Sequence, residues 1–140
     1  MVYKLTLSLG VILSIFFHSA AYAGKGTSPE AVQGAKTVSA EQAKQLWLEG
    51  ASFIDTRKDS DWEAGRIPSA LHINIKKPEF NAINILSYIN LDTPVVSYCN
   101  AEKCHRAANA AKKLVSFGFT NVYYYRDGFP SWKNAGYPYE

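Results

Sequence analysis

The two cysteines of this 140-residue chain, Cys99 and Cys104, lie close together in residues 97–114, SYCNAEKCHRAANAAKKL, and His105 directly follows the second. The apolar, β-branched residues 94–96 precede the pair, and an alanine-rich segment with helical spacing follows it. This pattern places both sulfurs at a strand-to-helix turn. A disulfide, a haem attachment, a metal site and a nucleophilic thiolate are the chemistries that such a pair could serve.

Cys99 is well placed for nucleophilic chemistry because it is the first residue of the predicted loop. A thiolate rather than a thiol is the nucleophile, and backbone N–H groups and a helix N-terminus favour the charged form. A loop that curls from a strand end onto a helix start directs its amides inward and binds anions. Lys103, His105 and Arg106 add positive charge at the rim of this loop, and Glu102 partly opposes them.

The first residues predict a secretory signal peptide. Lys4 precedes an apolar run over residues 5–17, and Ala21-Tyr22-Ala23 provides an A-x-A cleavage site. The apolar run is shorter than the ~20 residues that a membrane-spanning helix needs, so we expect no membrane association after cleavage. The mature protein is then exported, to the periplasm of a Gram-negative bacterium or otherwise to the outside. We expect three parts: residues 1–23 as signal peptide, residues 24–36 as an extended N-terminal segment and residues 37–140 as one domain.

Within that domain the patterns alternate between helix and strand. A helix is predicted from Ser39, with Gln42 completing a capping box, to Gly50. Further helices are predicted over residues 61–64, 78–90, 106–117 and 130–135, and strands over residues 52–55, 71–75, 94–98 and 121–125. Such alternation predicts a mainly parallel sheet covered by helices on both faces. Ligands of open sheets bind at the carboxyl ends of the strands, where Cys99 is expected.

Four segments in this order carry a family signature. Residues 54–57, IDTR, match a strand ending in D-x-R, and residues 62–70, WEAGRIPSA, are similar to [F/Y/W]-x-x-G-H-I-P-G-A. Residues 95–99, VVSYC, match a strand leading into an active-site loop, and residues 127–138 are similar to G-G-x-x-x-W…G-x-P. Together they resemble the rhodanese family of single-domain sulfurtransferases. The resemblance implies an α/β fold, the rhodanese-like three-layer α/β/α sandwich with a central, mainly parallel sheet.

The resemblance also implies an activity. A rhodanese-like enzyme would move sulfane sulfur from a small anionic donor such as thiosulfate to a thiol acceptor, through a persulfide on Cys99. No cofactor or metal is implied, and Asp55 and Arg57 would support the active-site loop rather than take part in the reaction. The implied substrate-binding loop consists of Asn100, Ala101, Glu102, Lys103, His105 and Arg106.

The loop departs from the usual family pattern. Arg106 takes the place of the residue that opens the following helix, but the loop from Cys99 is two residues longer than usual, and the extension carries Cys104. This resembles a subgroup of exported rhodaneses with a second cysteine in the loop. Cys104 could resolve the persulfide as a second thiol, or protect Cys99 from over-oxidation.

Three other function classes stay open. A thiol–disulfide redox protein would use the cysteine pair without a stable persulfide, and a non-catalytic rhodanese-fold binding module would not need Cys99 at all. Phosphatase or arsenate-reductase chemistry uses Cys-x-x-x-x-x-Arg, a spacing that Cys99 and Arg106 miss by one residue. A disulfide that only staples the loop gains little stability because the closed loop is so short.

Other ligands are disfavoured by the sequence. The C-x-x-x-x-C-H string is a wide variant of the haem-attachment motif C-x-x-C-H, but Met1 is the only methionine and leaves with the signal peptide. Four zinc ligands with familiar spacing are not visible. The net charge of +3, without a basic run, does not suggest a nucleic-acid partner.

Overall fold

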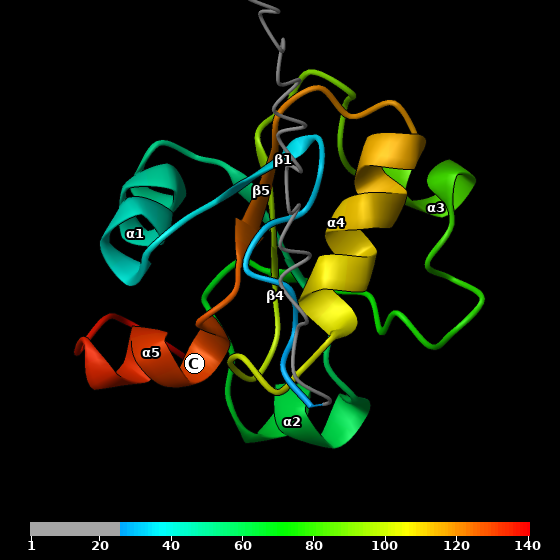
Figure 1. Cartoon of the computed structure of the whole chain (residues 1–140). Helices are drawn as coiled ribbons and strands as arrows, with labels where there is room; N and C mark the ends of the chain where they lie inside the picture. Colours follow the sequence, from blue (N-terminus) through cyan, green and yellow to red (C-terminus); the bar gives the residue numbers. More distant parts are fainter. Residues whose placement is uncertain (1–25) are drawn as a thin grey trace, which may run out of the picture.

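The computed structural model describes residues 26–140 of the chain (Figure 1). Its centre is a five-stranded sheet in the order β1-β5-β4-β2-β3. All four strand pairings are parallel. The strands are β1 (Ala35–Thr37), β2 (Ser52–Asp55), β3 (Leu71–His72), β4 (Val95–Tyr98) and β5 (Val122–Tyr125).

Helices cover both faces of this sheet. In Figure 1, α1 and α5 lie on one side, α4 and α3 lie on the other, and α2 lies near the carboxyl ends of the strands. The helices are α1 (Ala40–Leu48), α2 (Asp59–Ala64), α3 (Ala82–Leu86), α4 (Arg106–Ser116) and α5 (Gly128–Asn134). The predicted α/β/α sandwich around a mainly parallel sheet is therefore confirmed.

The central strand β4 is the element that carries the first cysteine to its place. All of its residues are buried, because α4 covers one face of the sheet and α1 and α5 cover the other. The buried face of α4 is built from small residues, which lets the helix lie close to the sheet: Ala107, Ala108, Ala110, Ala111 and, at its far end, Leu114. The Ser97 hydroxyl donates a 2.9 Å hydrogen bond to the Ala107 carbonyl and ties the first turn of α4 to the strand.

Local signals set several element ends. The capping box at α1 is present: the Gln42 N–H donates to Ser39 Oγ at 3.2 Å, and the Ser39 N–H donates to Gln42 Oε1 at 2.9 Å. The helix predicted over residues 78–90 is only the short α3, because Asn81 caps its start and the chain turns again after Leu86. The strand predicted over residues 71–75 ends at His72.

The sheet begins earlier than the sequence patterns suggested. Strand β1 starts at Ala35, inside the segment that we expected to be an N-terminal extension, and pairs with β5 from Ala35 to Thr37. Three residues are too short for a period-two pattern to be recognised. Val32, still further upstream, is 3% exposed and belongs to the core on the α4 side.

The predicted signal peptide lies in residues 1–25, outside the described residues. Within residues 26–140, no helix is both long enough and apolar enough to cross a membrane.

Candidate active site

Cys99 directly follows β4 and is almost completely buried, with 1% of its surface exposed. Its carbonyl accepts a 2.9 Å hydrogen bond from the Phe129 N–H. Gly128, the first residue of α5, has a positive φ of 63°, and a Cβ there would collide with the Cys99 carbonyl. The sequence Asp127-Gly128-Phe129 therefore allows the start of α5 to close against the end of β4.

The loop after Cys99 folds back so that Cys99 and Cys104 form a disulfide, with their Cα atoms 6.2 Å apart. Ala101 adopts a positive φ of 73°, and its carbonyl accepts a 3.0 Å hydrogen bond from the Cys104 N–H. Cys104 is only partly buried. The structure therefore represents the oxidised form of the pair, with one buried and one accessible sulfur.

The loop presents unpaired N–H groups. Within residues 26–140, the backbone N–H groups of residues 100–103 donate no hydrogen bond to a protein acceptor. His105 occupies the N-cap of α4 without a capping side-chain hydrogen bond, so the first turn of this helix also keeps free donors. A loop of free amides next to a helix N-terminus stabilises anions, including a thiolate.

A buried ion pair between Asp55 and Arg57, for which the resemblance implied a supporting role, lies next to this loop. Arg57 Nη2 lies 2.6 Å from Asp55 Oδ2, and both side chains are at most 3% exposed. Arg57 also donates to the Gly65 carbonyl at 2.6 Å and to Asn100 Oδ1 at 3.3 Å. The Asn100 amide in turn donates to Asp61 Oδ2 at 2.9 Å. The loop is thus linked to β2 and to α2 through one side chain.

Tyr98 completes the support, a role that sequence reasoning missed. Its hydroxyl donates to Asp55 Oδ2 at 2.7 Å and accepts the Ile67 N–H at 3.2 Å. Burial, together with the neighbouring Asp55 carboxylate, raises the pKa of Tyr98 far above its usual range, so the phenol stays protonated and remains a donor.

Arg106 opens α4 and is half-buried. Its Nη1 donates to Asn74 Oδ1 at 2.8 Å and lies 3.5 Å from the Thr56 carbonyl. Both acceptors are neutral, so the hydrogen bonds orient the guanidinium without cancelling its charge. His72 ends β3, and its Nε2 lies 3.0 Å from the Arg57 carbonyl.

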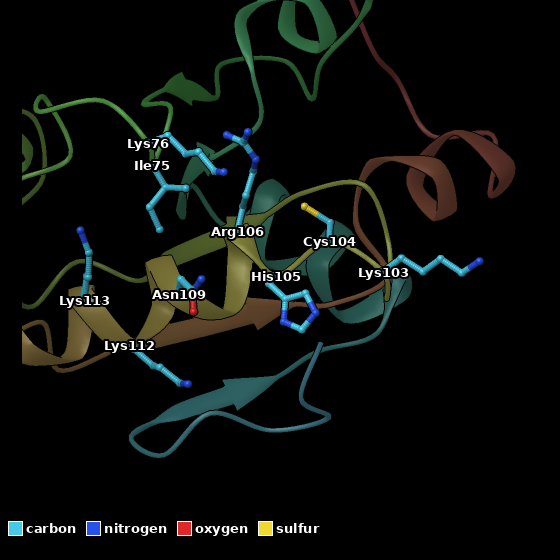
Figure 2. Close-up of a pocket in the computed structure, with 9 residues that line it drawn as sticks. All are labelled: Ile75, Lys76, Lys103, Cys104, His105, Arg106, Asn109, Lys112 and Lys113. Carbon is cyan, nitrogen blue, oxygen red and sulfur yellow. The ribbon is translucent and has the colours of Figure 1, made fainter. Parts of the chain in front are cut away.

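A hollow of about 750 Å³ lies beside the loop, and Figure 2 shows the side chains that line it. Cys104 belongs to its wall, whereas Cys99 does not. The lining residues come from the segment after β3, from the loop and from α4: Ile75, Lys76, Lys103, Cys104, His105, Arg106, Asn109, Lys112 and Lys113.

The structure therefore brings only part of the predicted loop to this hollow. Lys103, His105 and Arg106 line it, while Asn100 binds Arg57 and the Glu102 carbonyl accepts the Ser28 N–H at 2.6 Å. The contributions of α4 beyond its start could have been found from helical periodicity, because Asn109 and Lys113 follow Arg106 at i+3 and i+7. No periodicity in the sequence indicated that Lys76 lines the hollow.

Among the described residues, no group of three or more His, Cys, Asp or Glu side chains is arranged to hold a metal ion.

The fold and the cysteine at the start of a strand-to-helix loop define the class to which the chain belongs. The Rhodanese-like domain family matches residues 37–135, and the chain is a member of this family. Thiosulfate sulfurtransferase GlpE of Pseudomonas entomophila is 33% identical over 105 residues, which cover 75% of this chain and 90% of that relative.

Solved structures agree with this membership. The human single-domain sulfurtransferase TSTD1 is 26% identical with a TM-score of 0.60, over 71% of this chain and 96% of that one. The rhodanese-like domain of the Alr3790 protein from Anabaena sp. has a TM-score of 0.62, over 78% of this chain and 80% of that one, and at 21% identity this is a likeness of fold alone. The resemblance to rhodaneses is confirmed, while the exported subgroup stays a prediction.

Proposed function

We propose that this protein is a sulfurtransferase that moves sulfane sulfur from a small anionic donor such as thiosulfate to a thiol acceptor, through a persulfide on Cys99. The main support is the position of Cys99 at the carboxyl end of β4, under a loop whose amides of residues 100–103 have no protein acceptor within the described chain. The relatives named as sulfurtransferases point the same way.

The reaction divides into two displacements. In the first, the Cys99 thiolate attacks the outer sulfur of thiosulfate, a new S–S bond forms on Cys99, and sulfite leaves with the electron pair of the broken bond. In the second, an acceptor thiolate attacks the outer persulfide sulfur and takes it, which regenerates the Cys99 thiolate. The free backbone N–H groups would stabilise the negative charge of both the thiolate and the persulfide by hydrogen bonding.

Intact mass of the reduced protein before and after thiosulfate tests this proposal. We expect a gain of one sulfur atom that cyanide or a small thiol removes, and no gain in Cys99→Ser. Cys104→Ser should still gain sulfur, because Cys104 is not the nucleophile. An unchanged mass in the wild-type protein would contradict the proposal, and retention of the gain in Cys99→Ser would contradict the assignment of the nucleophile.

For Cys104 we propose a resolving or protective role. The Cys104 thiolate could attack Cys99 Sγ of the persulfide, form the Cys99–Cys104 disulfide and release hydrosulfide. Cys104→Ser should then release less hydrosulfide in the absence of an acceptor thiol and inactivate faster in peroxide. Unchanged hydrosulfide release together with unchanged peroxide sensitivity would contradict both roles.

The disulfide itself favours a second candidate, a thiol–disulfide redox protein on the same fold. In that case the pair would titrate with a defined midpoint potential, and thiosulfate would add no sulfur. The mass experiment separates the two candidates directly.

We also propose that the protein is exported. A mature chain lacking residues 1–23, recovered from the periplasm or the culture medium and identified by its N-terminal residue Gly24, would support export; an uncleaved chain in the cytoplasm would contradict it.

A further inference from the structure

The hollow beside Cys104 carries charge of one sign. Five of its nine lining side chains are cationic. No acidic residue of the described chain lines it. The five cations are Lys76, Lys103, Arg106, Lys112 and Lys113.

Within the described residues, none of these cations forms an ion pair. In residues 26–140, the ion pairs are Arg57–Asp55, Arg66–Glu140, Lys77–Asp59 and, for a protonated ring, His72–Asp59, so none of them involves a cation of the hollow. Lys113 Nζ lies over the Phe80 ring, 5.7 Å from its centroid, and this uncharged ring is not a counter-ion. A concave site lined by unpaired cations concentrates anions near it.

The two sulfurs of the disulfide differ in access to this site. Cys99 is 1% exposed and packs in the core under α4, whereas Cys104 is partly exposed and forms part of the wall of the hollow. Figure 2 shows the Cys104 sulfur turned towards the side of the loop where Arg106 and Lys76 lie. A thiolate that enters the hollow therefore meets Cys104 Sγ.

We propose that the hollow binds a small anionic thiol, one that carries a carboxylate, sulfonate or similar group, and that this thiol opens the Cys99–Cys104 disulfide by attack on Cys104 Sγ. The volume of about 750 Å³ would admit a molecule the size of a short peptide. This binding site goes beyond the proposed sulfur transfer and does not depend on it.

The exchange is balanced with two equivalents of the thiol. The first thiolate forms an S–S bond with Cys104, and the Cys99–Cys104 bond breaks with its electron pair on Cys99. The second thiolate attacks the thiol-derived sulfur of this mixed disulfide, forms the external disulfide and releases the Cys104 thiolate. The protein disulfide gains two electrons, and the two thiols supply them.

The loop explains why Cys99 is the leaving group. Within the described chain, the N–H groups of residues 100–103 and the uncapped start of α4 have no protein acceptor and can stabilise a thiolate on Cys99. A leaving thiol whose anion is stabilised leaves faster. The reaction thus delivers Cys99 in the charged form that nucleophilic chemistry needs.

Three thiols of the same length test the proposal on the oxidised protein: 2-mercaptoethanesulfonate, neutral 2-mercaptoethanol and cationic cysteamine. Disulfide opening is followed by acid quench, alkylation and intact mass. Each rate constant is divided by that of the same thiol with a neutral small disulfide, which removes differences in intrinsic reactivity.

We expect the corrected rate constants to fall from the sulfonate to the neutral thiol to the amine, with a span of about 10-fold or more at low salt that shrinks at high salt. Equal corrected rate constants would overturn the proposal. The trapped mixed disulfide should map to Cys104 by peptide mass, and an adduct on Cys99 would also overturn it.

A matched pair of variants separates the hollow from the overall charge of the protein. Lys112→Glu should remove most of the advantage of the sulfonate, whereas Lys36→Glu, the same charge change on the exposed edge strand β1 and outside the hollow, should keep it. An equal loss in both variants would overturn the proposal. The exchange rates do not depend on whether Cys99 forms a persulfide, so the result of one experiment does not decide the other proposal.

Discussion

At the scale of single residues, the site depends on polar groups that are buried and fully paired. Asp55 holds Arg57, and Arg57 reaches the loop through Asn100, while the Tyr98 hydroxyl binds the same carboxylate from the other side. Such a network orients its members strongly, because each unpaired group would pay the cost of lost hydration. The loop over Cys99 is therefore linked through Asn100 to the buried Asp55–Arg57 pair.

Removing the Tyr98 hydroxyl should expose this dependence. Tyr98→Phe leaves the Asp55 carboxylate with one donor fewer and the buried Ile67 N–H without its acceptor, so we expect a loss of about 1–3 kcal/mol in the free energy of unfolding in urea. Tyr123→Phe, at a half-buried tyrosine of the neighbouring strand β5, is the control and should change it little. Equal losses of unfolding free energy in Tyr98→Phe and Tyr123→Phe would contradict a stabilising role for the Tyr98 hydroxyl.

Buried tyrosines also predict the alkaline limit of stability. Burial raises the pKa of Tyr125 to about 12. Between about pH 10, where a free tyrosine ionises, and that value the unfolded chain releases a proton that the folded chain keeps. The contribution of Tyr125 is thus complete below about pH 10 and is lost as pH rises towards 12. Urea unfolding across this range should show falling stability, with a shallower slope in Tyr125→Phe; an unchanged slope would contradict the assignment.

At the scale of elements, the site is the meeting point of β4, α4 and α5. β4 delivers Cys99, the start of α4 supplies the free amides and Arg106, and α5 closes against the Cys99 carbonyl through Gly128 and Phe129. The close approach of α5 requires a residue without a side chain at that point.

Gly128→Ala tests this close approach. A Cβ at this position meets the Cys99 carbonyl and is also strained by the positive φ, so we expect a loss of more than about 2 kcal/mol in unfolding free energy. Gly136→Ala shares the strain, at a φ of 72°, but has open space around its Cβ, and should cost only about 1 kcal/mol. Comparable losses in the two variants would show that contact with Cys99 is unimportant.

At the scale of the whole molecule, the N-terminal segment is part of the site. The Ser28 N–H donates to the Glu102 carbonyl, and the Ser28 carbonyl accepts a hydrogen bond from Arg126 Nη2 at 3.0 Å. The Tyr124 hydroxyl donates to the neighbouring Pro29 carbonyl at 3.0 Å. Val32 anchors the same segment in the core. The loop after Cys99 is thus held by a part of the chain that precedes the first strand.

Shortening the chain tests this arrangement. A chain that starts at Gly34 loses the bond to Glu102 and the buried Val32, which should cost about 1.5–3 kcal/mol and accelerate hydrogen exchange at the Cys104 amide. A chain that starts at Thr27 keeps both contacts and is the control. Exchange that is equally slow in both chains would contradict a role for the segment in holding the loop.

The sequence by itself determined the alternation of helices and strands, the class of fold and the position of Cys99 at a strand-to-helix turn. These features follow from local patterns: the apolar run before Cys99, the alanine face of α4 and the capping box of Ser39. It also led to the family, because the matching segments stand in the right order along the chain.

Only the tertiary structure decided which distant residues meet at the site. Lys76 joins Arg106 and Lys112 at the hollow, Ser28 reaches Glu102, and Cys104 faces the hollow while Cys99 is buried. The strand order β1-β5-β4-β2-β3 places strands that are remote in sequence side by side, and the segments that flank these strands can then meet. Local periodicity reports which face of an element is buried but contains no information about its neighbours, so packing alone selected these partners.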